Sequence, residues 1–267
     1  MHRVNLQGID IKISRLSFGT GSLHHILTSQ RRQRLLAAAL YHGFSHFDTS
    51  PYYGFGMAEE ELGKFMRSHR NSVTTTTKVG LYPPRDLRPT SVCIWTTKLL
   101  GKIMPTLSRP TVDWSIAAAA RSLDCSLRRL GSDHVDLLLL HEPVSGAVES
   151  EVFLDWLTRE RAKGKIRGWG LAGHAACMDN WLSVNHLLGM VLQVRDSLDR
   201  KEADTVKIYG RNLQFTYGYL SSAQRFSGEL NATKILEKAL RRNAHGSIIV
   251  STRKLARLKE LATVVQE

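Results

Sequence analysis

Short apolar or β-branched segments alternate along the chain with longer segments in which apolar residues recur every three or four positions. Polar or glycine-containing turns separate the two kinds of segment, as is typical of buried parallel strands joined by helices. The pattern predicts strands at 16–19, 44–48, 73–78, 135–140, 166–171, 190–194, 206–209 and 247–250.

Two of the intervening segments show the helical period clearly. Between 115 and 130 the apolar residues follow one another at spacings of three and four, and Gly131 supplies a stop signal. The same spacing recurs between 253 and 266. Both segments are predicted to form amphipathic helices.

Eight strands alternating with helices over about 250 residues are typical of a closed (β/α)₈ barrel of the TIM type. An open, doubly wound α/β sheet is the alternative, and it usually carries a GxGxxG turn after its first strand. The nearest match, Phe18-Gly19-Thr20-Gly21-Ser22, lacks the third glycine. We therefore expect one barrel domain that spans residues 1–267.

Two regions depart from this alternation. The connection at 80–113, after the third predicted strand, carries five of the seven prolines. A connection of this length is uncommon unless it is functional, so we interpret it as a substrate loop with one helix near 95–103. Three aromatic residues in this connection or next to it are candidates to line a pocket or to anchor the loop by packing: Tyr82, Trp95 and Trp114. The second region, 195–230, is polar and gives no clear assignment.

The formal net charge of +13 is the unusual bulk property of the chain. Such a charge fits nucleic acid, an acidic partner or an anionic ligand such as a phosphorylated cofactor. The basic residues are spread over several predicted helices that are apolar on the other side, which favours solvated faces. We expect no nucleic-acid partner.

Other features exclude further classes. No apolar run approaches the length needed to span a bilayer, and residues 1–6 lack the apolar core of a secretory signal. The three cysteines, Cys93, Cys125 and Cys177, form no CxxC pair, which fits free thiols in a reducing compartment. We expect a cytoplasmic protein without a membrane partner, and no metal-ligand spacing such as HExxH is present.

Ionisable side chains stand at or just after the ends of three of the predicted strands. Asp48 is the last residue of the second strand, Lys78 is the last residue of the third, and His141 directly follows the fourth. Tyr53 is brought back toward the same place by the turn at Pro51. Because the strands of a parallel barrel all point the same way, residues just past their ends converge on one rim.

These four residue types suit proton transfer to a carbonyl oxygen. A neighbouring ammonium favours a phenolate and lowers the pKa of a tyrosine, and a carboxylate can hold that ammonium in place. Tyr53 would then be the general acid in reduction and the general base in oxidation, with Lys78 tuning it and Asp48 anchoring Lys78. His141 would orient the carbonyl.

Each residue taken alone has an ordinary structural interpretation. Asp48 fits a helix cap, and Tyr53 fits a partly buried aromatic with a satisfied hydroxyl. Lys78 could be a solvent-exposed residue at the rim of the barrel, and His141 could be a core or turn histidine whose ring nitrogens are hydrogen-bonded within the protein. The conjunction at three strand ends favours catalysis.

Three segments together resemble the aldo-keto reductase superfamily: Asp48-Thr49-Ser50-Pro51-Tyr52-Tyr53-Gly54, Lys78-Val79-Gly80 and Asp136-Leu137-Leu138-Leu139-Leu140-His141-Glu142-Pro143. Ser126-Leu127-Arg128-Arg129-Leu130-Gly131 and Gly164-Lys165-Ile166-Arg167-Gly168-Trp169-Gly170 are also similar to that family. The resemblance runs from Leu16 to Arg253, and it implies a (β/α)₈ barrel, a nicotinamide cofactor and the four residues above as a catalytic tetrad.

A dinucleotide needs a phosphate site, and barrels often build one from the loops after their last two strands. Ser251, Thr252 and Arg253 follow the eighth predicted strand, and Arg257 lies one turn further on. A helix N-terminus, hydroxyl donors and guanidinium groups all favour a phosphate there, although without the tetrad an ordinary helix cap followed by a basic face would be the favoured interpretation. With the tetrad present, the resemblance implies the site of the adenosine 2′-phosphate, and hence NADP(H) rather than NAD(H).

At the nicotinamide end, the resemblance implies that Gln193 contacts the carboxamide and that Tyr209 stacks on the ring. Gly19, Thr20 and Gly21 after the first strand would let the cofactor approach the backbone closely.

The chain also departs from the family pattern. Ala172-Gly173-His174 stands where the family has a Ser-Asn pair that holds the carboxamide, and the sequence ends soon after the last predicted helix. We expect looser nicotinamide orientation, partly supplied by His174, and a pocket defined by 80–113. The leading hypothesis is an NADP(H)-dependent oxidoreductase acting on a small carbonyl or alcohol. A non-catalytic, cofactor-binding regulatory protein on the same scaffold is the alternative.

Overall fold

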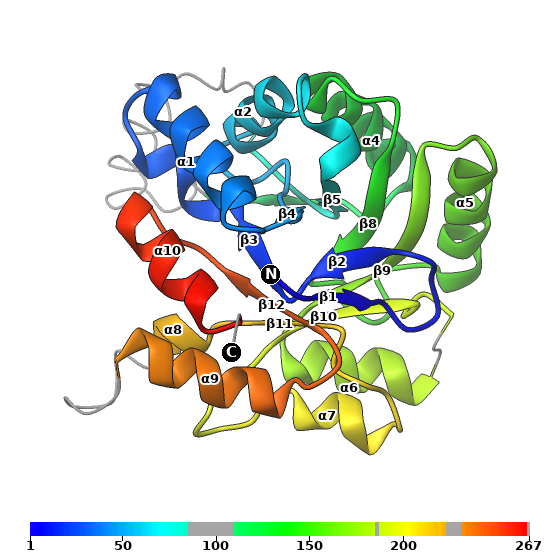
Figure 1. Ribbon diagram of the computed structural model, residues 1–267. Helices are drawn as coiled ribbons and strands as arrows, with labels where there is room; N and C mark the ends of the chain where they lie inside the picture. The colour runs from blue at the N-terminus through cyan, green and yellow to red at the C-terminus, as the bar shows by residue number, and fades with distance from the viewer. Residues whose placement is uncertain (85–108, 185–186, 223–230, 266–267) are drawn as a thin grey trace.

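Eight parallel strands close into a barrel in the computed structural model, which describes residues 1–84, 109–184, 187–222 and 231–265. Neighbours around the barrel follow the chain order, and the last strand pairs with the first through Ile248↔Leu16 and Val250↔Phe18. Figure 1 shows the strands surrounded by helices. The barrel strands are β3 (Leu16–Gly19), β4 (His46–Asp48), β5 (Thr74–Val79), β8 (Val135–His141), β9 (Ile166–Gly173), β10 (Val191–Arg195), β11 (Phe215–Tyr217) and β12 (Ser247–Val250). The predicted (β/α)₈ fold is confirmed.

The helices begin and end at the signals that the chain provides. Helix α4 starts after Ser115, whose hydroxyl accepts from the Ala118 N–H, and stops at Gly131 with φ 58°. The last helix is shorter than the predicted 253–266 and begins only after Lys254. The helices of the described residues are α1 (Ser29–Tyr41), α2 (Met57–Met66), α4 (Ile116–Leu130), α5 (Ser150–Ala162), α6 (Ala175–Val184), α7 (Asp204–Ile208), α8 (Tyr219–Ser222), α9 (Ala232–Arg242) and α10 (Leu255–Thr263), with short 3₁₀ turns η1 (Thr20–His25) and η2 (Arg70–Ser72). In these segments no helix has both the length and the apolar character needed to cross a membrane.

The predicted seventh strand at 206–209 is wrong. This segment belongs to α7, where Val206 is buried and Ile208 is 79% exposed. The seventh barrel strand is β11, which begins at residue 215 and not at residue 206, and it pairs with β10 and β12. A four-residue segment with only three apolar or aromatic residues does not distinguish a helical turn from a strand, because both bury one or two side chains over that length.

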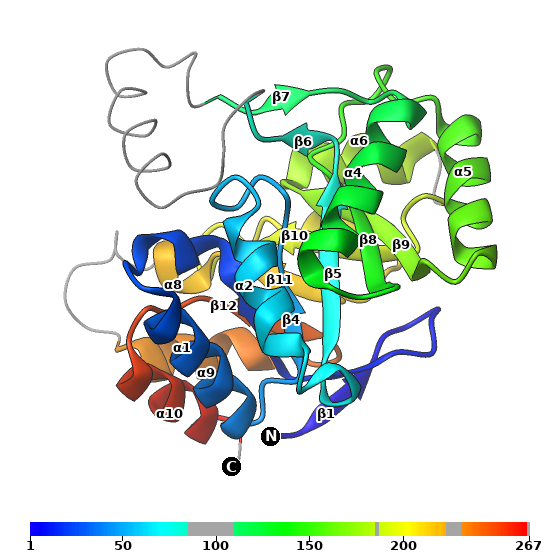
Figure 2. The same cartoon turned by 90° about the horizontal axis from the view of Figure 1, so that it is seen from above.

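Two small antiparallel sheets lie at opposite ends of the barrel (Figure 2). At the amino ends of the strands, β1 (Arg3–Asn5) and β2 (Lys12–Ser14) form a hairpin that the sequence analysis did not predict. Its apolar residues close the barrel interior by packing on inward-facing strand residues: Leu6, Ile11 and Ile13 against Leu137, Leu139, Val191 and Phe215. The hairpin therefore covers the barrel interior at the amino ends of the strands.

The second small sheet flanks the long connection after β5. Strand β6 (Leu81–Tyr82) pairs with β7 (Thr111–Val112), and Trp114 packs over Gly80, where an added Cβ would lie 2.0 Å from the indole ring. The helix expected near 95–103 and Trp95 lie outside the described residues. The ends of this connection are thus anchored on the carboxyl side of the barrel.

Candidate active site

The four predicted catalytic residues line one cavity of about 500 Å³ at the carboxyl ends of the strands. Asp48 ends β4, Lys78 lies in β5 and His141 ends β8. Tyr53 returns to the cavity through a turn in which its N–H donates to the Ser50 carbonyl at 3.0 Å and Gly54 has φ 59°. Three strand ends and one turn therefore bring together residues from four separate places in the chain.

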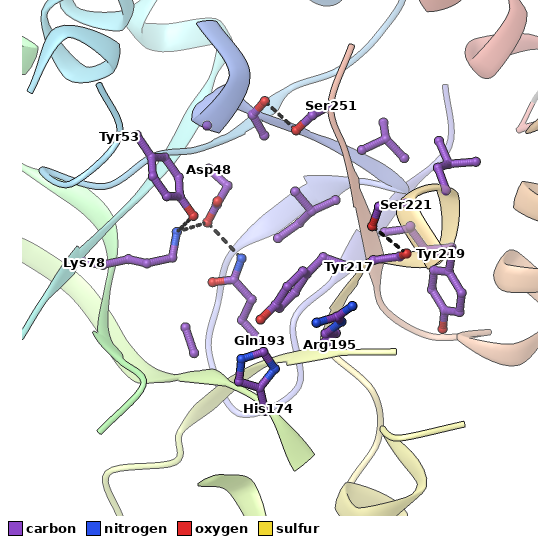
Figure 3. A pocket seen from close by; sticks show the side chains of 18 of the residues that line it. Asp48, Tyr53, Lys78, His174, Gln193, Arg195, Tyr217, Tyr219, Ser221 and Ser251 are labelled. Atoms are coloured by element: carbon purple, nitrogen blue, oxygen red, sulfur yellow. Dashed lines mark hydrogen bonds and ion pairs between the residues drawn. The ribbon is translucent and has the colours of Figure 1, made fainter. Parts of the chain in front are cut away.

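Lys78 is the centre of the hydrogen-bonded cluster. Its ammonium donates to Asp48 Oδ1 at 2.7 Å, to the Thr49 carbonyl at 2.9 Å and to the Tyr53 hydroxyl at 3.4 Å. Lys78 and Asp48 are only 2% and 3% exposed, so the ion pair is shielded from solvent. Figure 3 shows the three side chains along one side of the cavity. A buried pair of this kind holds both partners firmly, because breaking it would leave an uncompensated charge.

The pKa of Tyr53 is raised overall in this structure, in contrast to the expected lowering. Burial raises the pKa of Tyr53 well above 10, and the carboxylates of Asp48 and Glu142 raise it further. The ammonium of Lys78 makes its shorter contact with Asp48, at 2.7 Å, and a longer one with the Tyr53 hydroxyl, at 3.4 Å. Burial lowers the pKa of this lysine. Tyr53 is therefore a neutral phenol at neutral pH, which is the form that can donate a proton.

His141 faces Tyr53 across the cavity. The two rings are in a T-shaped arrangement with their centroids 6.2 Å apart, and the Ser50 hydroxyl lies 3.5 Å from His141 Nδ1. Burial lowers the pKa of His141 to about 3, with Lys78 and His174 contributing in the same direction. The imidazole is thus neutral at neutral pH and carries one N–H that can donate a hydrogen bond.

Four of the predicted cofactor-binding residues line the same cavity: Gly19, Gly21, Gln193 and Ser251. Gln193 donates from Nε2 to Asp48 Oδ1 at 3.0 Å, while its buried Oε1 has no hydrogen-bond partner among the described residues. An unpaired buried acceptor costs free energy unless a ligand satisfies it. A Cβ on Gly21 would already lie 3.6 Å from the Tyr53 ring. The unpaired Gln193 Oε1 can accept a hydrogen bond from a carboxamide, and Gly21 leaves room for a flat ring beside Tyr53.

The phosphate-site residues line a second cavity of about 750 Å³. Ser251, Thr252, Arg253 and Arg257 form one wall of it, and Ser251 also lines the first cavity. The opposite wall comes from α1, which adds Arg31 and Arg34. The two cavities therefore meet at Ser251, and the second one is lined by basic residues without a carboxylate among its described lining.

Two predicted cofactor residues are used elsewhere. The Thr20 hydroxyl donates to the Asp48 carbonyl at 3.0 Å and supports the strand end. Tyr209 follows α7, and its hydroxyl donates to Asp179 of α6 at 2.8 Å, outside the first cavity. The proposed stacking position of Tyr209 depended on the incorrect seventh strand. Tyr217, the last residue of β11, lines the cavity in its place.

The lining also includes Glu142, Arg195 and Tyr217, which sequence reasoning did not assign, and His174, which it expected to help orient the nicotinamide. Arg195 follows Gln193 by two positions, so strand alternation places both on one face, and Glu142 follows His141 directly. These spacings could have identified both residues. Figure 3 shows His174, Gln193, Arg195 and Tyr217 together on one side of the cavity. Tyr82 and Trp114, which were candidates for the lining, do not contribute to it.

Comparison with known proteins decides the family. A sequence profile described as the aldo/keto reductase family matches residues 15–182. The chain belongs to this family. The region matched by the profile contains all four tetrad positions, so the resemblance expected from the motifs is confirmed.

Two relatives found by sequence similarity have dehydrogenase names. Pyridoxal 4-dehydrogenase of Microbacterium luteolum is 26% identical over 75% of this chain and 59% of its own length. D-threo-aldose 1-dehydrogenase of a Pseudomonas species is 29% identical over 60% of this chain and 50% of its own length. The chain therefore spans between half and three fifths of these relatives.

Solved structures agree on the fold. An aldo-keto reductase from Bacillus halodurans superposes with a TM-score of 0.76, covering 100% of this chain and 91% of its own, at 16% identity. At this identity the likeness establishes the barrel architecture alone.

Proposed function

We propose that this aldo/keto reductase family member is an NADP(H)-dependent oxidoreductase that interconverts a carbonyl group and an alcohol. The observation that carries the proposal is the bonded cluster Asp48–Lys78–Tyr53 facing a neutral His141 in one cavity. The dehydrogenase names of two relatives support redox chemistry on a small organic molecule.

The residues of the chain supply positioning and the proton. His141 donates its N–H to the carbonyl oxygen and polarises it, and Tyr53 gives that oxygen its proton as negative charge develops. Lys78, held by Asp48, stabilises the phenolate that Tyr53 becomes when it has given up its proton. In the oxidative direction Tyr53 takes the proton back.

The nicotinamide cofactor supplies or accepts the hydride when bound. Gln193 Oε1 would accept from its carboxamide, Tyr217 would line the ring, and Gly19 and Gly21 would leave room for it. Ser251, Thr252, Arg253 and Arg257 would hold the adenosine 2′-phosphate, which is the basis for proposing NADP(H) over NAD(H). Ala172 and Gly173 offer no side-chain donor to the carboxamide, so Gln193 would be its main polar contact.

The first test combines cofactor titration with a mutation of the proton donor. Wild-type protein should bind NADPH more tightly than NADH in a fluorescence titration and should reduce members of a panel of aldehydes. Tyr53→Phe should bind NADPH normally but lose turnover by about a hundredfold or more, because the general acid is missing. The matched control is Tyr41→Phe, since Tyr41 is 86% exposed on α1.

The outcomes separate the hypotheses. Full activity in Tyr53→Phe would contradict the mechanism. NADPH binding by the wild type without turnover of any panel member would favour the regulatory alternative, for which the lack of carboxamide-holding side chains at 172–173 is the supporting observation.

A further inference from the structure

A carboxylate lies beside the proton donor without a role in the proposed chemistry. Glu142 directly follows His141, lines the cavity, and has a side chain that is 43% exposed. Its backbone is in the left-handed region at φ 54°, and its N–H donates to the Ala172 carbonyl at 2.6 Å. A left-handed conformation is uncommon for a residue with a side chain, and it is often retained where it orients a functional group. This conformation sets the position of Glu142 next to the tetrad.

His174 holds this carboxylate from the neighbouring strand. Its Nε2 lies 3.1 Å from Glu142 Oε1, so the ends of β8 and β9 are bridged at the cavity wall. His174 stands immediately after the Ala172-Gly173 pair, which offers no polar side chain to a ligand. Glu142 and His174 are therefore the polar side chains that this part of the wall presents.

The charges of the cavity limit what such a carboxylate can recognise. Asp48 and Glu142 are balanced by Lys78 and Arg195, so the lining carries no net charge that would attract a cation. An anionic group near Glu142 would be repelled, and an apolar group would desolvate the carboxylate without replacing its hydrogen bonds. A neutral group that donates hydrogen bonds fits best, and a carboxylate can accept from two hydroxyl groups at once.

We propose that Glu142, oriented by His174, determines specificity for neutral polyhydroxylated carbonyl compounds by accepting hydrogen bonds from hydroxyl groups beside the reacting carbon. This inference rests on the proposed oxidoreductase function and adds the class of substrate to it. Hydroxyl donors would replace the water that now solvates the exposed part of the carboxylate, whereas an analogue without hydroxyl groups would leave it unsatisfied.

The kinetic test compares D-glyceraldehyde with propanal, which lacks the two hydroxyl groups. The measured quantity is the ratio of their kcat/KM values in wild type and in Glu142→Gln, so that the differing hydration of the two aldehydes cancels. Wild type should favour glyceraldehyde, and the ratio should fall about tenfold to a hundredfold in the variant, mainly through KM. Glu142→Asp, which keeps the carboxylate, should restore part of the ratio. Glu151→Gln on α5 is the control and should leave the ratio unchanged.

A binding measurement separates this inference from the oxidoreductase proposal. Calorimetry with NADPH-loaded protein compares erythritol with 1,4-butanediol, and neither requires turnover. Erythritol should bind more tightly to wild type, and Glu142→Gln should remove the difference. If wild type reduces neither these two aldehydes nor any member of the aldehyde panel, the oxidoreductase proposal fails and the erythritol comparison alone decides the role of Glu142. An unchanged kinetic ratio in Glu142→Gln, equal affinity of the wild type for erythritol and 1,4-butanediol, or a wild-type preference for the anionic succinic semialdehyde would overturn the inference.

Discussion

Tyr53 and His141 are both held in their neutral forms by burial, although one is an acid and the other a base. The pKa of Tyr53 is raised because ionisation would create a buried anion near Asp48 and Glu142, and the pKa of His141 is lowered because protonation would create a buried cation near Lys78. Two neutral donors aimed at one cavity suit a carbonyl oxygen that gains negative charge during reaction.

These protonation states predict the pH dependence of the two reaction directions. His141 has a pKa of about 3 instead of 6.5, so reduction should show no inflection from His141 between about pH 5 and about pH 8. Oxidation needs deprotonated Tyr53, so its rate should rise with pH through this range. Initial rates of both directions should be measured as a function of pH in the His174→Gln variant. This substitution removes the exposed imidazole of the cavity wall, so that any inflection from an imidazole of the described lining comes from His141. An inflection near pH 6.5 in the reductive profile that disappears in His141→Gln would contradict this assignment.

At the scale of elements, the segment between β12 and α10 contributes to both cavities. Ser251 donates to the Gly19 carbonyl at 2.8 Å, and a Cβ on Gly19 would lie only 2.6 Å from its hydroxyl oxygen. Thr252 is 7% exposed and accepts from the Lys254 N–H at 3.1 Å. The segment is thus fixed against β3 at one end and forms its own turn at the other, which leaves the side chains of Arg253 and Arg257 exposed.

The exposed arginines predict cofactor preference. Replacing Arg253 and Arg257 together with alanine should weaken NADPH binding by about tenfold or more and change NADH binding much less, because only NADPH carries the 2′-phosphate. The NADPH affinity of the wild type should also fall more steeply with salt than that of the variant. Fluorescence titrations at two salt concentrations would measure both effects, with Arg241→Ala on α9 as the control. Equal losses for the two cofactors would argue against a 2′-phosphate site here.

At the scale of the whole molecule, the barrel closes where the first and last barrel strands meet. Arg15, just before β3, is 8% exposed and donates to the carbonyls of Gly246, Leu240 and Asn243 around the turn between α9 and β12. The Ser17 and Ser247 hydroxyl oxygens lie 2.6 Å apart across the same junction. A buried guanidinium thereby joins segments that are more than two hundred residues apart in the sequence.

Removing this guanidinium should destabilise the closed barrel. Arg15→Met keeps the length of the side chain but leaves three carbonyls without their donor, so the free energy of unfolding should fall by about 3 kcal/mol. Arg159→Met is the control, because its ion pair with Asp155 on α5 is solvent-exposed and should contribute less than about 1 kcal/mol. Urea unfolding would measure both variants. Equal, small changes would show that other contacts dominate barrel closure.

The strand ends that carry the tetrad could be predicted, but other parts could not. Asp48, Lys78 and His141 stand at the ends of segments rich in apolar or β-branched residues, so their meeting at one rim followed from parallel topology. Tyr209 was assigned from a four-residue run that folds as a helix, and Tyr217 was overlooked because β11 is only three residues long. The hairpin β1–β2 was also overlooked, since its strands are three residues each and gain their burial only against the barrel interior.

The sequence by itself determined the fold class and indicated the four proposed catalytic residues and the basic segment at 251–257, because periodicity and strand-end positions are local properties of the chain. Only the tertiary structure decided which strand completes the barrel, that Tyr217 and not Tyr209 lines the cavity, and that Tyr53 and His141 are both neutral. These depend on burial and on charges contributed by distant segments, as when Glu142 raises the pKa of Tyr53 and Asp48 takes up the charge of Lys78. These electrostatic interactions act between residues that are distant in the sequence and become neighbours only in the folded chain.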